Sequence, residues 1–207
     1  MTKTSMCIGS ASLKKGLSPC PADGGAEGTL PKGKERMSKY KTFAAAFSYP
    51  DAEFLTFFPA QKDRQKELSF EYDRLFRNNE VWLYSSEYKA ENEFQRAENL
   101  ADINGFYRAF ALETNTDRPD ALPCELEFMH YLIFKELHAK KSNLPDANEK
   151  ITLCLDAQKK FFREHLYPAA KKISKAVISR TKNNFYREIA RQLFTFVEDE
   201  AAFLKLS

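Results

Sequence analysis

Glu127 and His130 form the one Glu-x-x-His motif of the sequence. A spacing of three residues places a carboxylate and an imidazole on the same face of a helix, where both could bind a metal ion. A carboxylate-bridged di-iron bundle needs two such motifs and two further glutamates. Because the second motif is absent, we favour a packed or capping role for His130. We predict no metal and no other cofactor, and keep a metal centre at this pair as an alternative.

A second group of residues combines aromatic, apolar and acidic side chains in the middle of the chain. Its aromatic and apolar members are Leu75, Phe76, Trp82, Tyr84 and Tyr88, and its acidic members are Glu87, Asp120, Glu125 and Glu127. Core packing and ordinary surface salt bridges are one explanation. The other is a groove for a partner's segment, because aromatic anchors dominate such contacts. The carboxylates would then suit a segment that carries arginines, through charge-assisted hydrogen bonds.

The charges are separated along the chain. Residues 79–138 hold 12 acids and 5 bases, whereas residues 139–191 hold 13 bases and 5 acids. The basic run comprises Lys159, Lys160, Arg163, Lys171, Lys172, Lys175, Arg180 and Lys182. It could bind nucleic acid or an acidic protein. Apolar residues are interspersed with these cations at helical spacing, which favours a solvated helix face.

Several functional classes are excluded or disfavoured by what the sequence contains. It has no Gly-x-Ser-x-Gly, His-Glu-x-x-His or P-loop motif. Gly105 is the only glycine after residue 33, which argues against a nucleotide-binding α/β fold. No apolar run approaches the length of a transmembrane helix. The four cysteines form no Cys-x-x-Cys pair, and without a secretory signal they indicate a reducing, cytoplasmic setting.

Helical periodicity dominates the sequence from Tyr40 onward, and no convincing strand alternation is present. We predict helices over 51–58, 62–77, 92–112, 122–137, 147–165, 168–180 and 184–204. Asp146 is the predicted N-cap of the fifth of these, and Pro168 the predicted start of the sixth. Residues 1–36 cluster Gly, Pro, Ser and Lys without an aromatic residue, which predicts a disordered extension. Residues 37–207 are predicted to form one all-α globular domain of six or seven helices around a buried central helix.

Five segments, in this order, resemble the TorD/DmsD/NarJ-type family of redox-enzyme maturation chaperones. They are EYDRLF (Glu71–Phe76) with LYSSEY (Leu83–Tyr88), LADINGFYRAFAL (Leu100–Leu112), RPDALPCELEFMHYL (Arg118–Leu132), FFREHLYPAAKKI (Phe161–Ile173) and FYREIARQLFTFVEDE (Phe185–Glu200). The sequence is most similar to delta subunits of type II dimethyl-sulfoxide-reductase-family enzymes. Two positions depart from the family pattern, because Ala121 replaces a histidine and Ala169 replaces a tryptophan.

The resemblance implies an all-helical, non-catalytic, cytoplasmic protein that is not inserted in a membrane and does not bind nucleic acid. Its partner would be the catalytic subunit of a molybdenum oxidoreductase, often bound through a twin-arginine leader. The chaperone would hold this subunit until molybdopterin guanine dinucleotide is inserted, and so delay export. A homodimer is left open. The residues expected to form the partner-binding surface are Leu75, Phe76, Tyr84, Glu87, Tyr88, Pro119, Asp120, Glu125 and Glu127.

Overall fold

The computed structural model describes residues 32–114, 116–142 and 144–206, and its regular structure is helical. The α-helices are α1 (Lys32–Ala46), α2 (Ala52–Phe57), α3 (Gln65–Tyr72), α4 (Glu93–Ala109), α5 (Leu122–Lys141), α6 (Ala147–Phe161), α7 (Tyr167–Arg180) and α8 (Asn184–Phe203). The shorter segments are the 3-10 helices η1 (Pro59–Arg64) and η3 (Ser85–Tyr88) and the π-helices η2 (Asp73–Arg77) and η4 (Phe162–Leu166). Within the described residues, β pairing is limited to one bridge between Tyr84 and Ala121. The all-α prediction is confirmed.

Some of these segments adjoin one another. The described residues therefore form seven continuous helices and the separate short helix η3. The segments η1, α3 and η2 follow one another directly, and so do α6, η4 and α7. The predicted helix from Pro168 to Arg180 is confirmed as α7, although it continues directly from the preceding helical segments. Pro168 lies in the first turn of α7 directly after the π-helix η4. A π segment changes the backbone hydrogen-bond pattern locally, so the helix continues through a residue that cannot donate.

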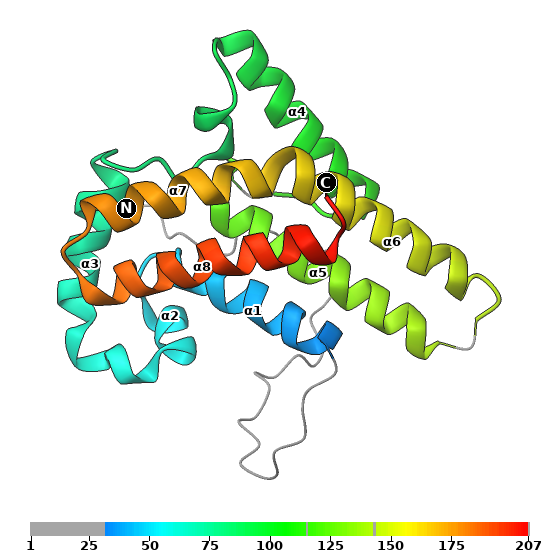
Figure 1. The fold of residues 1–207 in the computed structure, drawn as a ribbon, viewed down its shortest axis with the longest axis horizontal. Helices are drawn as coiled ribbons and strands as arrows, with labels where there is room; N and C mark the ends of the chain where they lie inside the picture. Colours follow the sequence, from blue (N-terminus) through cyan, green and yellow to red (C-terminus); the bar gives the residue numbers. More distant parts are fainter. Residues whose placement is uncertain (1–31, 115, 143, 207) are drawn as a thin grey trace.

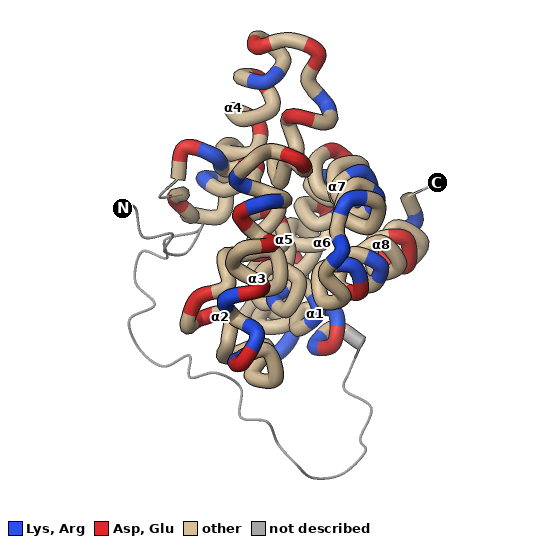
Figure 2. Tube along the Cα trace, turned by 90° about the vertical axis from the view of Figure 1, so that its left-hand side faces the viewer, with Lys and Arg blue, Asp and Glu red and all other residues tan. Residues whose placement is uncertain are grey.

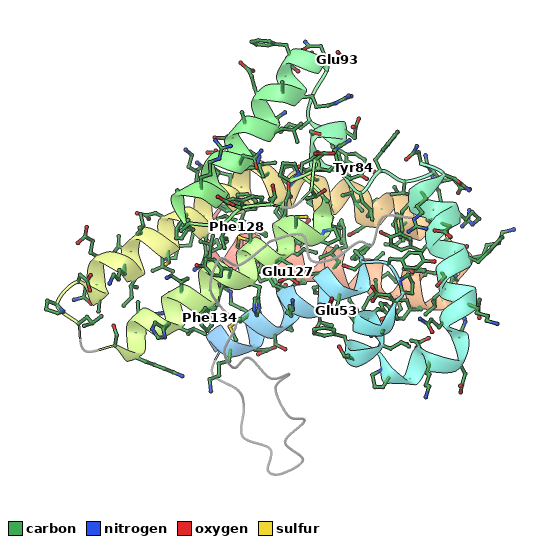
Figure 3. All side chains as sticks on the ribbon, turned by 180° about the vertical axis from the view of Figure 1, so that it is seen from behind. Glu53, Tyr84, Glu93, Glu127, Phe128 and Phe134 are labelled. Atoms are coloured by element: carbon green, nitrogen blue, oxygen red, sulfur yellow. The ribbon has the colours of Figure 1, made fainter. Side chains whose placement is uncertain are left out.

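The helix α5 is the centre of the core. Its first two turns bury Leu122, Leu126 and Met129 together with Phe128, whose ring lies 4.7 Å from that of Phe161 between centroids. The helices α1 and α6 pack against α5, and α7 packs against α8. Figures 1 and 3 show α7 and α8 on one face of the molecule and α1 and α5 on the other, with the N-terminal half of α4 projecting away from both. No described helix is both long and apolar enough to cross a membrane.

Side-chain caps define the starts of three helices. Asp51, Asn92 and Asn183 precede α2, α4 and α8 with extended backbones, and each accepts hydrogen bonds from backbone N–H groups of the first turn. The predicted cap at Asp146 is wrong. Asp146 has φ −89° and ψ 8°, outside the extended region that caps prefer, and its side chain makes no capping bond. It forms an ion pair with Lys150 instead.

A buried ion pair attaches the first helix to the last. The Arg36 guanidinium donates from Nε and from a terminal nitrogen to the Glu200 carboxylate, both at 2.8 Å, and Tyr40 donates its hydroxyl to the same carboxylate at 3.0 Å. Gln158 of α6 accepts a further bond from Arg36 at 3.2 Å. Helix α1 therefore overlaps the last residues of the predicted 1–36 extension. Residues 1–31 lie outside the described residues, where that prediction stays untested.

We expect Glu200→Ala to lower the free energy of unfolding by about 3 kcal/mol, because it leaves the nearly buried Arg36 cation without its partner. Glu198→Ala is the matched control on the same helix. Glu198 pairs with Lys171 near the surface, where such pairs contribute roughly 1 kcal/mol or less. Urea unfolding followed by circular dichroism measures both changes. Equal losses in the two variants would contradict the role assigned to the buried pair.

Candidate functional site

The candidate site is built on residues 81–88, here called the site loop, which run against the start of α5. Leu122 donates its N–H to the Leu83 carbonyl at 2.7 Å, and Ser85 donates to the Asp120 carbonyl at 2.9 Å. Successive side chains of this extended stretch point to opposite sides. Leu83 and Ser85 are accordingly buried, while Tyr84 between them remains half-exposed.

Two buried carboxyl side chains hold the site loop in place. Asp120 is fully buried and accepts from the N–H of Ser86 at 3.2 Å, from the Ser86 hydroxyl, and from Arg118 at 2.9 and 3.0 Å. Glu125 is equally buried and accepts from the Ser85 hydroxyl. Because neither carboxyl group reaches the surface, both act on the loop rather than on a partner.

The guanidinium of Arg118 joins the remaining polar groups of the site. It binds Asp120, lies 3.1 Å from Oε1 of Glu87, and stacks over the Tyr84 ring at 3.6 Å from the centroid. Arg96 of α4 pairs with the other oxygen of Glu87, also at 3.1 Å. The acids that we expected to attract a partner's arginines are thus bound to arginines of the chain itself. Sequence reasoning missed this role of Arg118, although its position two residues before Asp120 was a usable signal.

An aromatic pocket of about 310 Å³ opens beside the site loop. It is lined by Tyr49, Tyr72, Phe76, Arg77, Asn79, Leu83 and Tyr84. The Tyr72 ring lies 5.4 Å from Tyr49 and 4.9 Å from Phe76 between centroids. Phe76 and Tyr84 were predicted site residues, whereas Tyr49 and Tyr72 were not. These two meet because the turn that follows α1 packs against α3, a contact that no sequence pattern predicts.

Three other predicted site residues have mainly structural contacts. Leu75 is fully buried in the core, and Pro119 is buried and accepts a bond from the Tyr107 hydroxyl at 2.9 Å. Tyr88 is half-exposed and donates its hydroxyl to the Trp82 carbonyl at 2.9 Å. Tyr88 is therefore part of the accessible surface of the site, whereas Leu75 and Pro119 are buried beneath that surface.

Glu127 lies apart from the rest of the predicted surface. Figure 3 shows it on the face of α5 beside α1, whereas Tyr84 lies near the base of the α4 projection. The Lys41 ammonium of α1 donates to Glu127, and His130 Nδ1 lies 2.9 Å from the Met37 carbonyl oxygen. Burial is the main cause that lowers the pKa of His130. Both members of the Glu-x-x-His motif are thus engaged with α1.

Within the described residues, one group brings three potential metal ligands together, namely Asp102, Glu164 and His165. His165 Nε2 lies 2.8 Å from an Asp102 carboxylate oxygen. Arg163 pairs with the Glu164 carboxylate at 2.9 Å, and Lys89 donates to the Glu164 carbonyl at 3.1 Å. Two cations beside Glu164 oppose the approach of a third. Burial lowers the pKa of His165, so this arrangement fits a histidine hydrogen-bonded to Asp102 better than a metal centre.

The buried Glu125 predicts a pH dependence of stability. Burial is the largest cause that raises its pKa well above 4.5, the nearby Asp120 charge adds to this, and the Ser85 bond only partly opposes it. A carboxyl whose pKa is higher in the folded than in the unfolded protein destabilises the fold as the pH rises above the unfolded pKa. Glu125→Gln removes this ionisation.

We expect Glu125→Gln to gain stability relative to the parent protein as the pH rises from 5 to 8, because over that range the parent must keep Glu125 protonated or bury its charge, and the amide does not ionise. Urea unfolding at both pH values provides the measurement. A difference between the two proteins that is independent of pH would show that Glu125 is not held neutral by burial.

Comparison with known proteins places the chain in a family. A family model described as nitrate reductase delta subunit matches residues 41–172, which is more than half of the chain and includes the site loop, the aromatic pocket and all of α5. No curated protein matches the sequence significantly. The chain therefore belongs to the nitrate reductase delta subunit family, the TorD/NarJ type of maturation chaperones, whose members are not catalysts.

Proposed function

We propose that this chain is a system-specific chaperone that binds the cofactor-free catalytic subunit of a molybdenum oxidoreductase in the cytoplasm. It would assist insertion of the molybdenum cofactor before the enzyme is assembled and exported. Family membership supports the chaperone role and the class of partner. The resemblance of the sequence to delta subunits of the dimethyl-sulfoxide-reductase family supports a client of that family.

The observation that carries the binding proposal is the aromatic pocket beside the site loop. Its rings supply apolar contact area at low cost in side-chain entropy, and Tyr84 presents a half-exposed ring at its edge. Arg77 lies over the Tyr49 ring at 4.3 Å and so adds a cation to the lining. A pocket of this kind fits an apolar side chain of a partner's segment.

The bonds beneath the site loop support the same proposal. Ser85 and Ser86 are bound to buried carboxyl groups, and Arg118 covers one face of Tyr84. A loop that is already ordered loses little conformational entropy when a partner binds. The pocket is thus pre-organised for recognition, whereas Glu127 and His130 offer no comparable open arrangement because α1 engages both.

Affinity capture tests the proposed function. The tagged full-length protein is expressed in its native cells during anaerobic growth, and captured proteins are identified by mass spectrometry. We expect one large molybdenum-enzyme subunit that lacks its cofactor. The absence of any such subunit, in cells shown to produce one, would contradict the proposal.

We expect Tyr84→Ala to reduce capture of that subunit at least about fivefold, because an aromatic anchor at the edge of a pocket contributes more than about 1 kcal/mol to binding. Tyr84→Phe should retain binding, since it keeps the ring that lines the pocket and stacks under Arg118. Phe70 is an aromatic residue on α3 with 74% of its surface exposed, away from the pocket lining, and Phe70→Ala is the matched control. Quantitative mass spectrometry of the captured subunit gives the ratio.

If Tyr84→Ala and Phe70→Ala capture the subunit equally well, the aromatic pocket is not the binding surface. Circular dichroism of each variant confirms that the comparison is made between folded proteins.

A further inference from the structure

The first part of α4 projects from the rest of the molecule beside the site loop. Glu93, Phe94 and Ala97 are exposed there, and 72% of the Phe94 surface is accessible. Figures 1 and 2 show this projection, and Figure 2 marks the acidic and basic positions along it. The helix packs against η3 and α6. Since the exposed side chains pack little against the core, the direction of the projection depends on the contacts that α4 makes with these neighbours.

Arg96 connects this part of α4 to the site loop. A terminal nitrogen of its guanidinium lies 3.1 Å from Oε2 of Glu87, which belongs to η3. Only residues 89–92 separate η3 from α4, so the ion pair closes a short connection between the two helices. It thereby limits the angle at which α4 leaves the site loop. Further along α4, Asp102 makes another polar contact, with His165 of η4.

The Glu87 carboxylate also contacts the group that covers Tyr84. Its Oε1 lies 3.1 Å from Arg118, whose guanidinium stacks over the Tyr84 ring at 3.6 Å from the centroid. The next residue is Tyr88, whose hydroxyl donates to the Trp82 carbonyl at 2.9 Å. A displaced Glu87 would therefore change the surroundings of both half-exposed tyrosines of the site.

The contact of Arg96 with Glu87 contributes little to the free energy of folding. The Arg96 side chain is 40% exposed, and ion pairs near the surface stabilise a fold weakly. Its Nε is buried without a hydrogen-bond partner among the described residues, which offsets part of that gain. The buried bonds of Ser85 and Ser86 hold the site loop independently of Arg96. The contact of Arg96 with Glu87 therefore orders an exposed surface rather than the core.

We infer that Arg96 is a positioning residue of the partner-binding surface. Through Glu87 it sets the direction of α4 beside the site loop and holds Tyr84 and Tyr88 in one arrangement. The inference rests on the proposed function and adds α4 to the elements that determine binding. A surface that is ordered before binding loses less conformational entropy when the partner docks. Loss of the Arg96 guanidinium should therefore weaken binding, although Arg96 lies outside the aromatic pocket.

Trp82 provides a probe of this arrangement in the full-length protein. It is the only tryptophan of the sequence, and its exposed ring lies in the site loop, 6.2 Å from that of Tyr84 between centroids. We expect Arg96→Ala to increase the quenching of Trp82 fluorescence by acrylamide. It should also speed amide exchange at residues 84–100 about threefold, a size typical of the loss of one partly exposed ion pair. Raising sodium chloride should produce the same changes in the parent protein, because salt screens exposed ion pairs.

Three further variants show whether the effect arises from the contact with Glu87. Arg96→Lys should restore most of the parent behaviour, because an ammonium group can still pair with Glu87. Arg108→Ala is the matched control, since Arg108 is an exposed arginine of the same helix without an ion pair in the part of the chain that the structure describes. In the Glu87→Gln background, Arg96→Ala should add little, because the two changes remove the same contact. Thermal unfolding should be nearly the same with Arg96→Ala as in the parent, which separates positioning from stability.

Capture of the molybdenum-enzyme subunit tests the consequence for binding. We expect Arg96→Ala to recover about one third as much subunit as the parent protein, and Arg96→Lys and Arg108→Ala to recover nearly the parent amount. The inference is overturned if Arg96→Ala leaves quenching and exchange unchanged, or if Arg108→Ala changes them equally. It is also overturned if Arg96→Ala keeps its full effect in the Glu87→Gln background.

The proposed function and the role of Arg96 can fail separately. If the parent protein and Arg96→Ala capture the subunit equally well, the chaperone function stands and the positioning role of Arg96 fails. If the parent protein captures no such subunit, the proposed function fails whatever the quenching and exchange of the variants show.

Discussion

The geometry of the site depends most on one side chain, the guanidinium of Arg118. It neutralises the fully buried Asp120, reaches the carboxylate of Glu87 and covers the Tyr84 ring. A buried carboxylate without such a partner would be protonated or would destabilise the fold. With Arg118 in place, Asp120 can accept the bonds of Ser86 that hold the site loop. The accessible surface of the site is thus positioned by charges that a partner never touches.

A second buried ion pair, between the first and the last helix, also holds separate elements together. Arg36 and Glu200 form a buried pair that joins α1 to α8, and Tyr40 and Gln158 complete its hydrogen bonds. Between the two ion clusters lies the apolar core around α5, where Phe128 contacts Phe161 and Tyr107. The fold therefore combines an aromatic core with two specific polar clusters, and the Arg118 cluster lies beside the aromatic pocket.

The helices could be predicted from sequence because each buries one face, which spaces its apolar residues at the helical period. The helix boundaries depend instead on local backbone geometry. Pro168 does not interrupt its helix because a π segment precedes it, and Asp146 does not cap because its backbone is not extended. The site was harder to predict. The sequence shows which residues are acidic, but it does not show which cation each one meets or which acids share a surface.

Glu125 and Glu127 illustrate the difficulty. Two residues along an α-helix correspond to a rotation of about 200°, so Glu125 points to the site loop and Glu127 to α1. Tyr49 and Tyr72 line the pocket together because the turn after α1 packs against α3. Motif matching cannot identify a surface that several elements assemble, because a motif does not show which residues meet in the fold.

Hydrogen exchange followed by mass spectrometry, on the protein alone and in complex with the captured cofactor-free subunit, tests the central claim most directly. Amides that become buried by a partner exchange more slowly. The account predicts new protection in residues 76–89, which include the site loop and part of the pocket lining. Protection confined to the groove of about 510 Å³ between α1 and α8, which Lys39, Phe43 and Arg191 help to line, would contradict it.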